Sequence, residues 1–172
     1  MVKIKLEHAT PHDYVEFIRF YNDLNLNLIY TWNGINHRET VRQDDDFFEG
    51  FDFPEYSFDE FQSDLFSECH RIYMIRAYDT KKRETNTIGY IHMMYCAKKE
   101  YRLFDWAMTL DEYKNIVWKQ LLDIKFPRCR KISVYMGGSD ETKEWLKSLG
   151  FSEHSSHYGC VEIELAKSQV AD

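Results

Sequence analysis

The sequence predicts an α/β fold of the α+β kind, in which a mixed and mostly antiparallel central sheet is flanked by helices. Three observations carry this prediction: strand and helix patterns alternate at both ends, three strand patterns follow one another in the middle, and a helix separates two later strands. The 172 residues fit one domain, and 44% of them are apolar, which suffices for one core. We therefore expect a single domain that spans residues 1–172.

The N-terminal half begins with a strand and continues with two helices. Residues 2–7 alternate apolar and charged side chains, which is typical of a strand. Thr10 and Pro11 follow as an N-cap and a proline at the first helical position. Ser57 opens the second helix, because it forms the capping box "SFDE" with Glu60.

Three strands are expected at residues 70–78, 87–96 and 101–108, and the polar turns between them indicate an antiparallel meander. A helix with one apolar face follows and ends at Pro127. The next strand, residues 131–136, should be parallel to the preceding one because a helix separates them.

The C-terminal part begins with a short helix over residues 139–149, which Gly150 caps. The segment "FSEHSSHYGCVEIEL" then closes the chain as a hairpin. His154, His157 and Cys160 lie three residues apart, which does not suit metal ligands on a strand because such positions face opposite sides. We therefore expect no metal there.

Composition argues against several classes of binding partner and cellular location. The net charge of −7 disfavours nucleic acid and anionic membranes. Four cysteines without a CxxC pair indicate reduced thiols, with no disulfide framework and no zinc site. The N-terminus lacks a signal-peptide pattern, and no window reaches the roughly 18 apolar residues of a membrane span. These features predict a cytoplasmic protein.

The element order, together with "ETKEWLKSLGF" at residues 141–151, resembles the GNAT family of N-acetyltransferases. The resemblance covers nearly the whole chain, and its most specific piece is "LKSLGF", which is similar to the family's helix-to-strand junction. It implies a V-shaped split between the parallel strands 101–108 and 131–136, in which acetyl-CoA would bind as co-substrate. It also implies an amine acceptor that enters from the other side.

The resemblance places acetyl-CoA against two stretches of the chain. The pantetheine arm would pair with the backbone of the first parallel strand, and the pyrophosphate would rest on the N-terminus of the following helix. The implied cofactor-binding residues are Trp106, Ala107, Met108, Tyr113, Lys114, Asn115 and Ile116. No metal cofactor is expected.

Two features depart from the family pattern. The family's pyrophosphate loop contains glycines, whereas the corresponding "LDEYKNI" has none and carries Asp111 and Glu112, which would repel a phosphate. Lys114 and Asn115 offer some compensation. The family's tyrosine that protonates the leaving thiolate corresponds to Leu146, which cannot donate a proton.

These features therefore allow two interpretations of the function. The preferred one is an acetyl-CoA-dependent N-acetyltransferase that acts on a small, cationic amine or a peptide amine. The alternative is a non-catalytic binding or regulatory protein on the same fold that has lost acetyl-CoA binding. Whether the chain is an enzyme thus depends on whether the donor binds.

Asp105 and His92 are the candidate catalytic bases, since both lie on predicted central strands. A base must reach the amine by a hydrogen bond, and its pKa should lie near the working pH. Histidine needs little adjustment for this, whereas aspartate needs burial. Each of them could instead be a satisfied polar residue on a half-buried strand.

A long acidic and aromatic loop is expected over residues 25–56, where turn residues interrupt any period. Eight acids and no Lys or Arg fall within residues 44–60, interleaved with aromatic side chains. Acids attract ammonium groups and aromatic faces add cation–π attraction, so this loop is expected to bind the acceptor. The candidate substrate-binding residues are Asp44, Asp45, Asp46, Phe47 and Phe48. A solvated loop anchored by its phenylalanines, or a homodimer contact, are the alternatives.

Overall fold

The structure is a computed structural model that describes residues 1–22, 30–31, 56–96, 99–135, 140–154 and 160–165. Within them, eight strands form one sheet in the order β1-β3-β4-β5-β6-β8-β7, with β2 paired to β5 outside this path. The strands are β1 Val2–His8, β2 Tyr30–Thr31, β3 His70–Asp79, β4 Glu84–Cys96, β5 Glu100–Met108, β6 Lys131–Tyr135, β7 Ser152–Glu153 and β8 Cys160–Glu164. Only β5 and β6 pair in parallel, so the predicted mixed sheet is confirmed.

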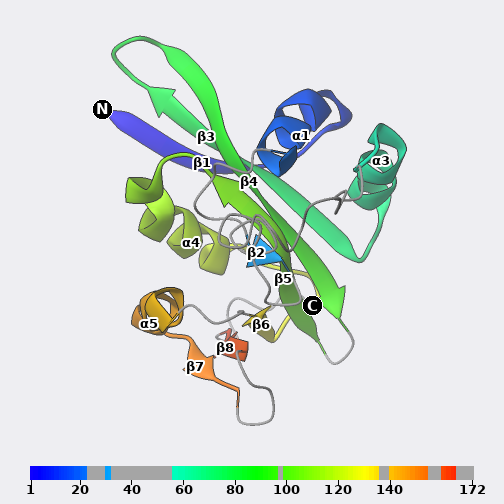
Figure 1. The fold of residues 1–172 in the computed structure, drawn as a ribbon, viewed down its shortest axis with the longest axis vertical. Coiled ribbons are helices and arrows are strands. Elements are labelled where there is room, and N and C mark those ends of the chain that lie inside the picture. Colours follow the sequence, from blue (N-terminus) through cyan, green and yellow to red (C-terminus); the bar gives the residue numbers. More distant parts are fainter. Residues whose placement is uncertain (23–29, 32–55, 97–98, 136–139, 155–159, 166–172) are drawn as a thin grey trace, which may run out of the picture.

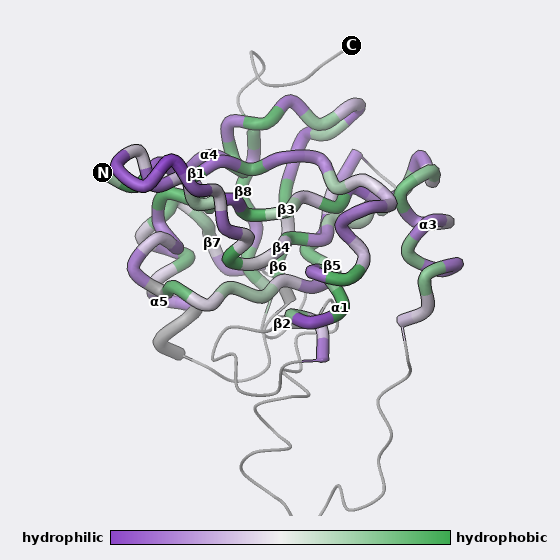
Figure 2. The backbone as a smooth tube through the Cα atoms, turned by 90° about the horizontal axis from the view of Figure 1, so that it is seen from above, coloured by the Kyte–Doolittle hydropathy of each residue, from purple (hydrophilic) through white to green (hydrophobic). Residues whose placement is uncertain are grey.

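Helices cover both faces of the sheet (Figure 1). They are α1 Tyr14–Asn22, α3 Phe58–Phe66, α4 Lys114–Asp123 and α5 Asp140–Ser148, and short 3-10 turns, Pro11–Asp13 and Asp111–Tyr113, precede α1 and α4. Apolar side chains of α1 and α3 pack on one face, whereas those of α4 and α5 pack on the other. In Figure 2, α3 alternates between hydrophobic and hydrophilic segments, as expected for a helix with one buried face.

The predicted helix boundaries are confirmed at two caps. The Ser57 hydroxyl accepts a hydrogen bond of 3.2 Å from the backbone N–H of Glu60, whose carboxylate accepts one of 2.8 Å from the Ser57 N–H. At the end of α5, Gly150 has a φ of +102°, which glycine adopts without strain. The Phe151 N–H then donates to the carbonyl of Leu146 at 3.2 Å and closes the helix.

The structure corrects one expectation, because residues 25–56 are not wholly irregular. Tyr30 and Thr31 form β2, which pairs with β5. A two-residue strand gives too little alternation to be seen as a period in the sequence. Residues 32–55 lie outside the described part of the chain.

All four cysteines are free, which agrees with the expectation of no disulfide. Cys129 and Cys160 are buried, and burial raises the pKa of each thiol to about 11. Among the described helices, none is both long and apolar enough to cross a bilayer.

We expect Gly89→Ala to lower the free energy of unfolding by about 1–3 kcal/mol, as overpacking of a core does. Gly89 lies on β4 opposite Met108, and an added Cβ would approach the backbone oxygen of Ala107 to 2.0 Å. Urea unfolding measures the loss. Thr85→Ala, an exposed site on the same strand, is the control and should change stability by less than about 0.5 kcal/mol.

Candidate functional site

A split opens between the two parallel strands. β5 and β6 pair only where Glu100, Tyr101 and Arg102 face residues 131–133. Beyond Arg102, β5 continues for six more residues to Met108 without further pairing to β6. The edge of β5 that faces β6 is therefore available over its C-terminal half to another strand or to a ligand.

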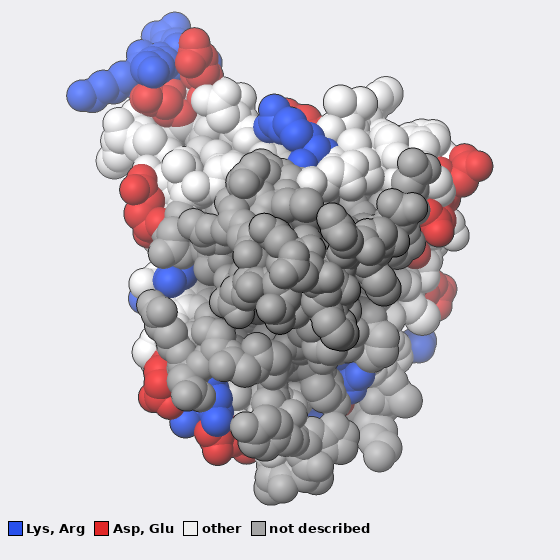
Figure 3. All heavy atoms as spheres, viewed as in Figure 1, with Lys and Arg blue, Asp and Glu red and all other residues white. Residues whose placement is uncertain are grey.

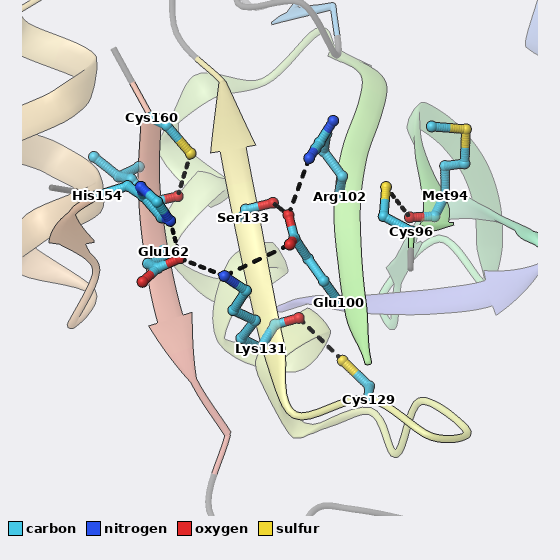
Figure 4. Close-up of polar contacts among 11 residues, drawn as sticks. Met94, Cys96, Glu100, Arg102, Cys129, Lys131, Ser133, His154, Cys160 and Glu162 are labelled. Atoms are coloured by element: carbon cyan, nitrogen blue, oxygen red, sulfur yellow. Dashed lines mark hydrogen bonds and ion pairs between the residues drawn. The ribbon is translucent and has the colours of Figure 1, made fainter. Parts of the chain in front are cut away.

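Polar side chains hold the closed end of the split together (Figure 4). Glu100 on β5 accepts hydrogen bonds from Ser133 on β6 and, at 3.3 Å, from Arg102. Lys131 lies 3.5 Å from Glu100 and 2.8 Å from Glu162 on β8. Burial raises the pKa of Glu100, but the bond from Ser133 and the two cations outweigh it and lower the pKa below its ordinary value. This network fixes the point at which the strands part.

β2 lies on the open edge of β5. Tyr30 pairs with Trp106 and Thr31 with Asp105, and the same two β5 residues pair with Ile91 and His92 on β4. A strand has two edges, so β2 must occupy the one that faces the split. Ala107 and Met108 pair only with β4 among the described strands. Of the expected pantetheine-binding residues, Trp106 therefore pairs with β2, whereas Ala107 and Met108 have no pairing with β2.

Three tryptophans pack together beside the split. Trp106 on β5 stacks on Trp145 of α5 with ring centroids 6.1 Å apart and an angle of 13° between the planes. Trp118 on α4 meets both edge-on, at 5.5 Å and 5.7 Å. Trp106 and Trp118 are fully buried. These rings fill the space between β5, α4 and α5 and join the two helices that border the split.

The start of α4 carries the residues expected to hold the pyrophosphate. Asn115 accepts a hydrogen bond of 2.7 Å from the Trp145 indole, and the Lys114 ammonium lies 5.0 Å from the centre of that ring. Ile116 is 45% exposed and Tyr113 is half-buried. Two of the four residues therefore already contact α5, and a pyrophosphate at this helix start would meet Trp145.

Basic side chains gather at one corner of the molecule (Figure 3). This corner is the turn between β3 and β4, where Lys81, Lys82 and Arg83 are exposed. The pKa of Tyr113 is raised by desolvation, by its hydrogen bond to Glu112 and by the charge of Asp79, which precedes the turn. The acid that precedes this turn therefore acts electrostatically on Tyr113, directly before α4.

Asp105 and His92 are direct cross-strand partners and point to the face covered by α1 and α3. Both are buried, at 4% and 1% exposure. The Asp105 carboxyl group accepts hydrogen bonds from the hydroxyl of Tyr90 and, at 2.9 Å, from the backbone N–H of Trp106. The register between β4 and β5 shifts between Leu103 and Asp105, which is a β-bulge directly before Asp105.

His92 belongs to a polar cluster that the sequence did not predict. Its Nε2 lies 2.8 Å from Nδ1 of His70 on β3 and 4.0 Å from the carboxylate of Asp64 on α3. The Tyr56 hydroxyl donates to the same carboxylate. Burial, with the charge of a protonated His70 as a smaller cause, lowers the pKa of His92 to about 3. His92 is thus neutral at pH 7 but is a weak base.

The remaining predicted residues fall into two groups. Leu146 is buried in the core, where its side chain packs with the face of α5 that meets the sheet. The expected acceptor-binding residues Asp44, Asp45, Asp46, Phe47 and Phe48 lie outside the described residues.

Comparison with known proteins defines the fold. No family model matches the sequence, and no curated protein matches it. Solved structures do match: a variant of the spermidine N-acetyltransferase SpeG from Vibrio cholerae has a TM-score of 0.61 at 15% identity, over 95% of both chains. A GNAT-family acetyltransferase from Staphylococcus aureus has a TM-score of 0.56 at 13% identity, over 95% of this chain and 100% of that one.

A third structure is the N-acetyltransferase PseH from Campylobacter jejuni, solved in complex with acetyl coenzyme A. Its TM-score is 0.51 at 12% identity, over 95% of this chain and 100% of that one. These likenesses extend over nearly the whole chain. The protein therefore has the GNAT acetyltransferase fold, as its element order and the split between β5 and β6 indicate.

Proposed function

We propose that this protein is an acetyl-CoA-dependent N-acetyltransferase that acts on a cationic amine. The observation that carries the proposal is the split, in which two parallel strands part after three paired residues. Among the described strands, Ala107 and Met108 pair only with β4, which leaves their other edge to a ligand. Support comes from the shared fold of acetyltransferases, one of them solved with acetyl coenzyme A. The donor would lie along Ala107 and Met108, with its phosphates toward the start of α4.

The reaction would be a direct transfer. The amine nitrogen attacks the thioester carbonyl, the carbon–sulfur bond breaks, the nitrogen loses a proton, and the departing thiolate takes one up. Asp105 lies on β5 next to the donor-binding backbone and is our candidate for the group that accepts the amine proton. His92 is the second candidate, although its lowered pKa makes it the weaker base. The leaving thiolate would be protonated by solvent, because Leu146 has no proton to give.

The acceptor class follows from charge. The chain has a net charge of −7, and eight acids without a Lys or Arg lie within residues 44–60. An ammonium group gains from such a field and from the interleaved aromatic faces. We propose Asp44, Asp45, Asp46, Phe47 and Phe48 as its contacts. Spermidine is the first acceptor to test, since SpeG is named for it.

The test is acetylation of a panel of amines, read by mass spectrometry because the exposed Cys69 thiol would react with a thiol reagent. Spermidine, an aminoglycoside and a lysine peptide are compared with an alcohol of similar size. Asp105→Asn should lower kcat by about 100-fold or more, as loss of a general base does. Asp123→Asn, an exposed site on α4, should leave it unchanged. Absence of acetylated product with every amine would contradict the proposal.

A non-catalytic protein is the second candidate, and specific contacts favour it. β2 lies on the edge of β5, and Trp145 binds Asn115 at the start of α4. Both contacts occupy places that the donor would need. If they are permanent, the protein does not bind acetyl-CoA and the fold serves another ligand.

The contact of β2 with β5 gives a prediction that separates these candidates. In an antiparallel pair only one of two neighbouring residues directs its N–H to the partner strand, so Tyr30→Pro and Thr31→Pro are tested separately. If β2 competes with the donor, the variant that loses the pairing N–H should bind acetyl-CoA more tightly, and the other serves as its control. Isothermal titration calorimetry measures both. Equal affinities in both variants and the unchanged protein would show that β2 does not compete.

A further inference from the structure

Three side chains from three separate elements converge on one point beneath α3. Asp64 comes from α3, His70 from β3 and His92 from β4, and one potential ligand atom from each lies within 4.8 Å of the others. His92 pairs with Ile72, so His70, two residues earlier on β3, points to the same face of the sheet. The packing of α3 on β3 brings Asp64 over this face.

The distances within the cluster suit a shared ion. Nδ1 of His70 lies 2.8 Å from Nε2 of His92, while Nε2 of His70 lies 3.7 Å from Oδ1 of Asp64. Nε2 of His92 lies 4.0 Å from the other oxygen of Asp64, Oδ2. In a tetrahedral zinc site, bonds of about 2.0–2.2 Å separate the ligand atoms by roughly 3.3–3.5 Å. One potential ligand atom from each residue lies within 4.8 Å of the other two, so small movements of the side chains would bring three atoms into a coordination sphere.

The surroundings hold the ligands in place. The Tyr56 hydroxyl donates to Oδ2 of Asp64, so Oδ1, which lies 3.7 Å from Nε2 of His70, is the oxygen that would bind an ion. The ring of Phe104 lies 4.7 Å from that of His92 and 6.1 Å from that of His70. A hydrogen bond to a ligating carboxylate and an apolar wall beside the imidazoles are the supports that metal ligands commonly have.

We propose that Asp64, His70 and His92 form a binding site for a divalent transition metal, with Zn²⁺ the best fit. Two imidazoles and one carboxylate are ligands that zinc accepts, and three protein ligands leave a fourth position open to water or to a substrate atom. The ion would tie α3 to β3 and β4. No sequence pattern predicts this site, because the three residues follow no metal-binding spacing and come together only through the sheet and the packing of α3.

The test uses the full chain, without acetyl-CoA and without an amine, so that its result is independent of the proposed catalysis. Zn²⁺ is titrated by calorimetry and Co²⁺ by visible absorption. We expect one equivalent of each to bind and thermal unfolding to move upward with Zn²⁺. The absorption should report nitrogen and oxygen ligands, without a sulfur-to-cobalt charge-transfer band.

Variants identify the site. His70→Ala and the isosteric Asp64→Asn should abolish the binding, and Tyr56→Phe should weaken it by about 10–100-fold, as loss of a supporting hydrogen bond does. His12→Ala, an exposed histidine, and Cys69→Ser, the exposed neighbour of His70, should bind as the unchanged protein does. The proposal is overturned if no stoichiometric binding occurs, if binding survives Asp64→Asn, or if Cys69→Ser abolishes it.

Discussion

Trp118→Ala is expected to lower the free energy of unfolding by about 3–5 kcal/mol, the loss typical of deleting a large buried ring. Trp118 is 1% exposed and contacts Trp106, Trp145 and Phe151, with ring centroids 5.5–5.9 Å away. Small domains are stable by only about 5–15 kcal/mol, so this single change should remove a large part of the margin. Urea unfolding followed by circular dichroism measures it.

Trp118→Phe is the matched control. The Trp118 Nε1 has no hydrogen-bond partner among the described residues, so phenylalanine removes part of the ring volume and no hydrogen bond. We expect a clearly smaller loss than with alanine. Equal losses from the two variants would mean that the indole acts through a polar contact and not through packing between β5, α4 and α5.

Arg76→Met is expected to cost about 3 kcal/mol, because it leaves two partly buried carboxylates without their cation. Arg76 on β3 donates to Asp13 and, at 2.6 Å, to Glu16. Its own side chain is 18% exposed and that of Asp13 is 12% exposed. This ion cluster links the start of α1 to the sheet, and thermal unfolding at pH 7 measures its contribution.

The same variant should change how stability depends on pH. Burial raises the pKa of Asp13, but hydrogen bonds from Thr10 and Arg76 outweigh it, and the pKa ends below its ordinary value of 3.8. In Glu16, burial is likewise outweighed by Thr87 and Arg76, and the pKa ends below 4.5. Groups with lowered pKa values stabilise the fold above their unfolded values and lose this as the pH falls through the folded ones.

Arg76→Met should therefore flatten the loss of stability between about pH 5 and pH 2. Arg83→Met, an exposed site in the turn between β3 and β4, should leave both the stability and its pH dependence unchanged. An acid limb as steep in Arg76→Met as in the unchanged protein would show that other carboxylates carry the acid sensitivity.

Local sequence patterns predicted most of the fold. The capping box at Ser57, the C-terminal hairpin and the glycine after α5 are each determined by neighbours in the chain, and the structure confirms them. The parallel pairing of β5 and β6 followed from the helix between them. The split was expected only through the family resemblance.

The candidate site was less predictable, because it depends on contacts between residues far apart in the chain. Tyr30 and Thr31 form a strand only by pairing with residues of β5 that lie more than 70 residues later. His92 was singled out as a base, but its partner His70 comes from another strand. No periodicity or spacing within a single segment encodes such pairs.

The central claim is that the split binds acetyl-CoA although the loop before α4 has no glycine. Thermal unfolding with and without acetyl-CoA at about 1 mM tests it most directly. Adenosine at the same concentration is a control for binding of the nucleoside alone. A ligand that binds only the folded state with a Kd of about 10 µM stabilises it by roughly 2.7 kcal/mol. We predict a clear upward shift of Tm with acetyl-CoA. An unchanged Tm would contradict the acetyltransferase assignment and leave only the fold.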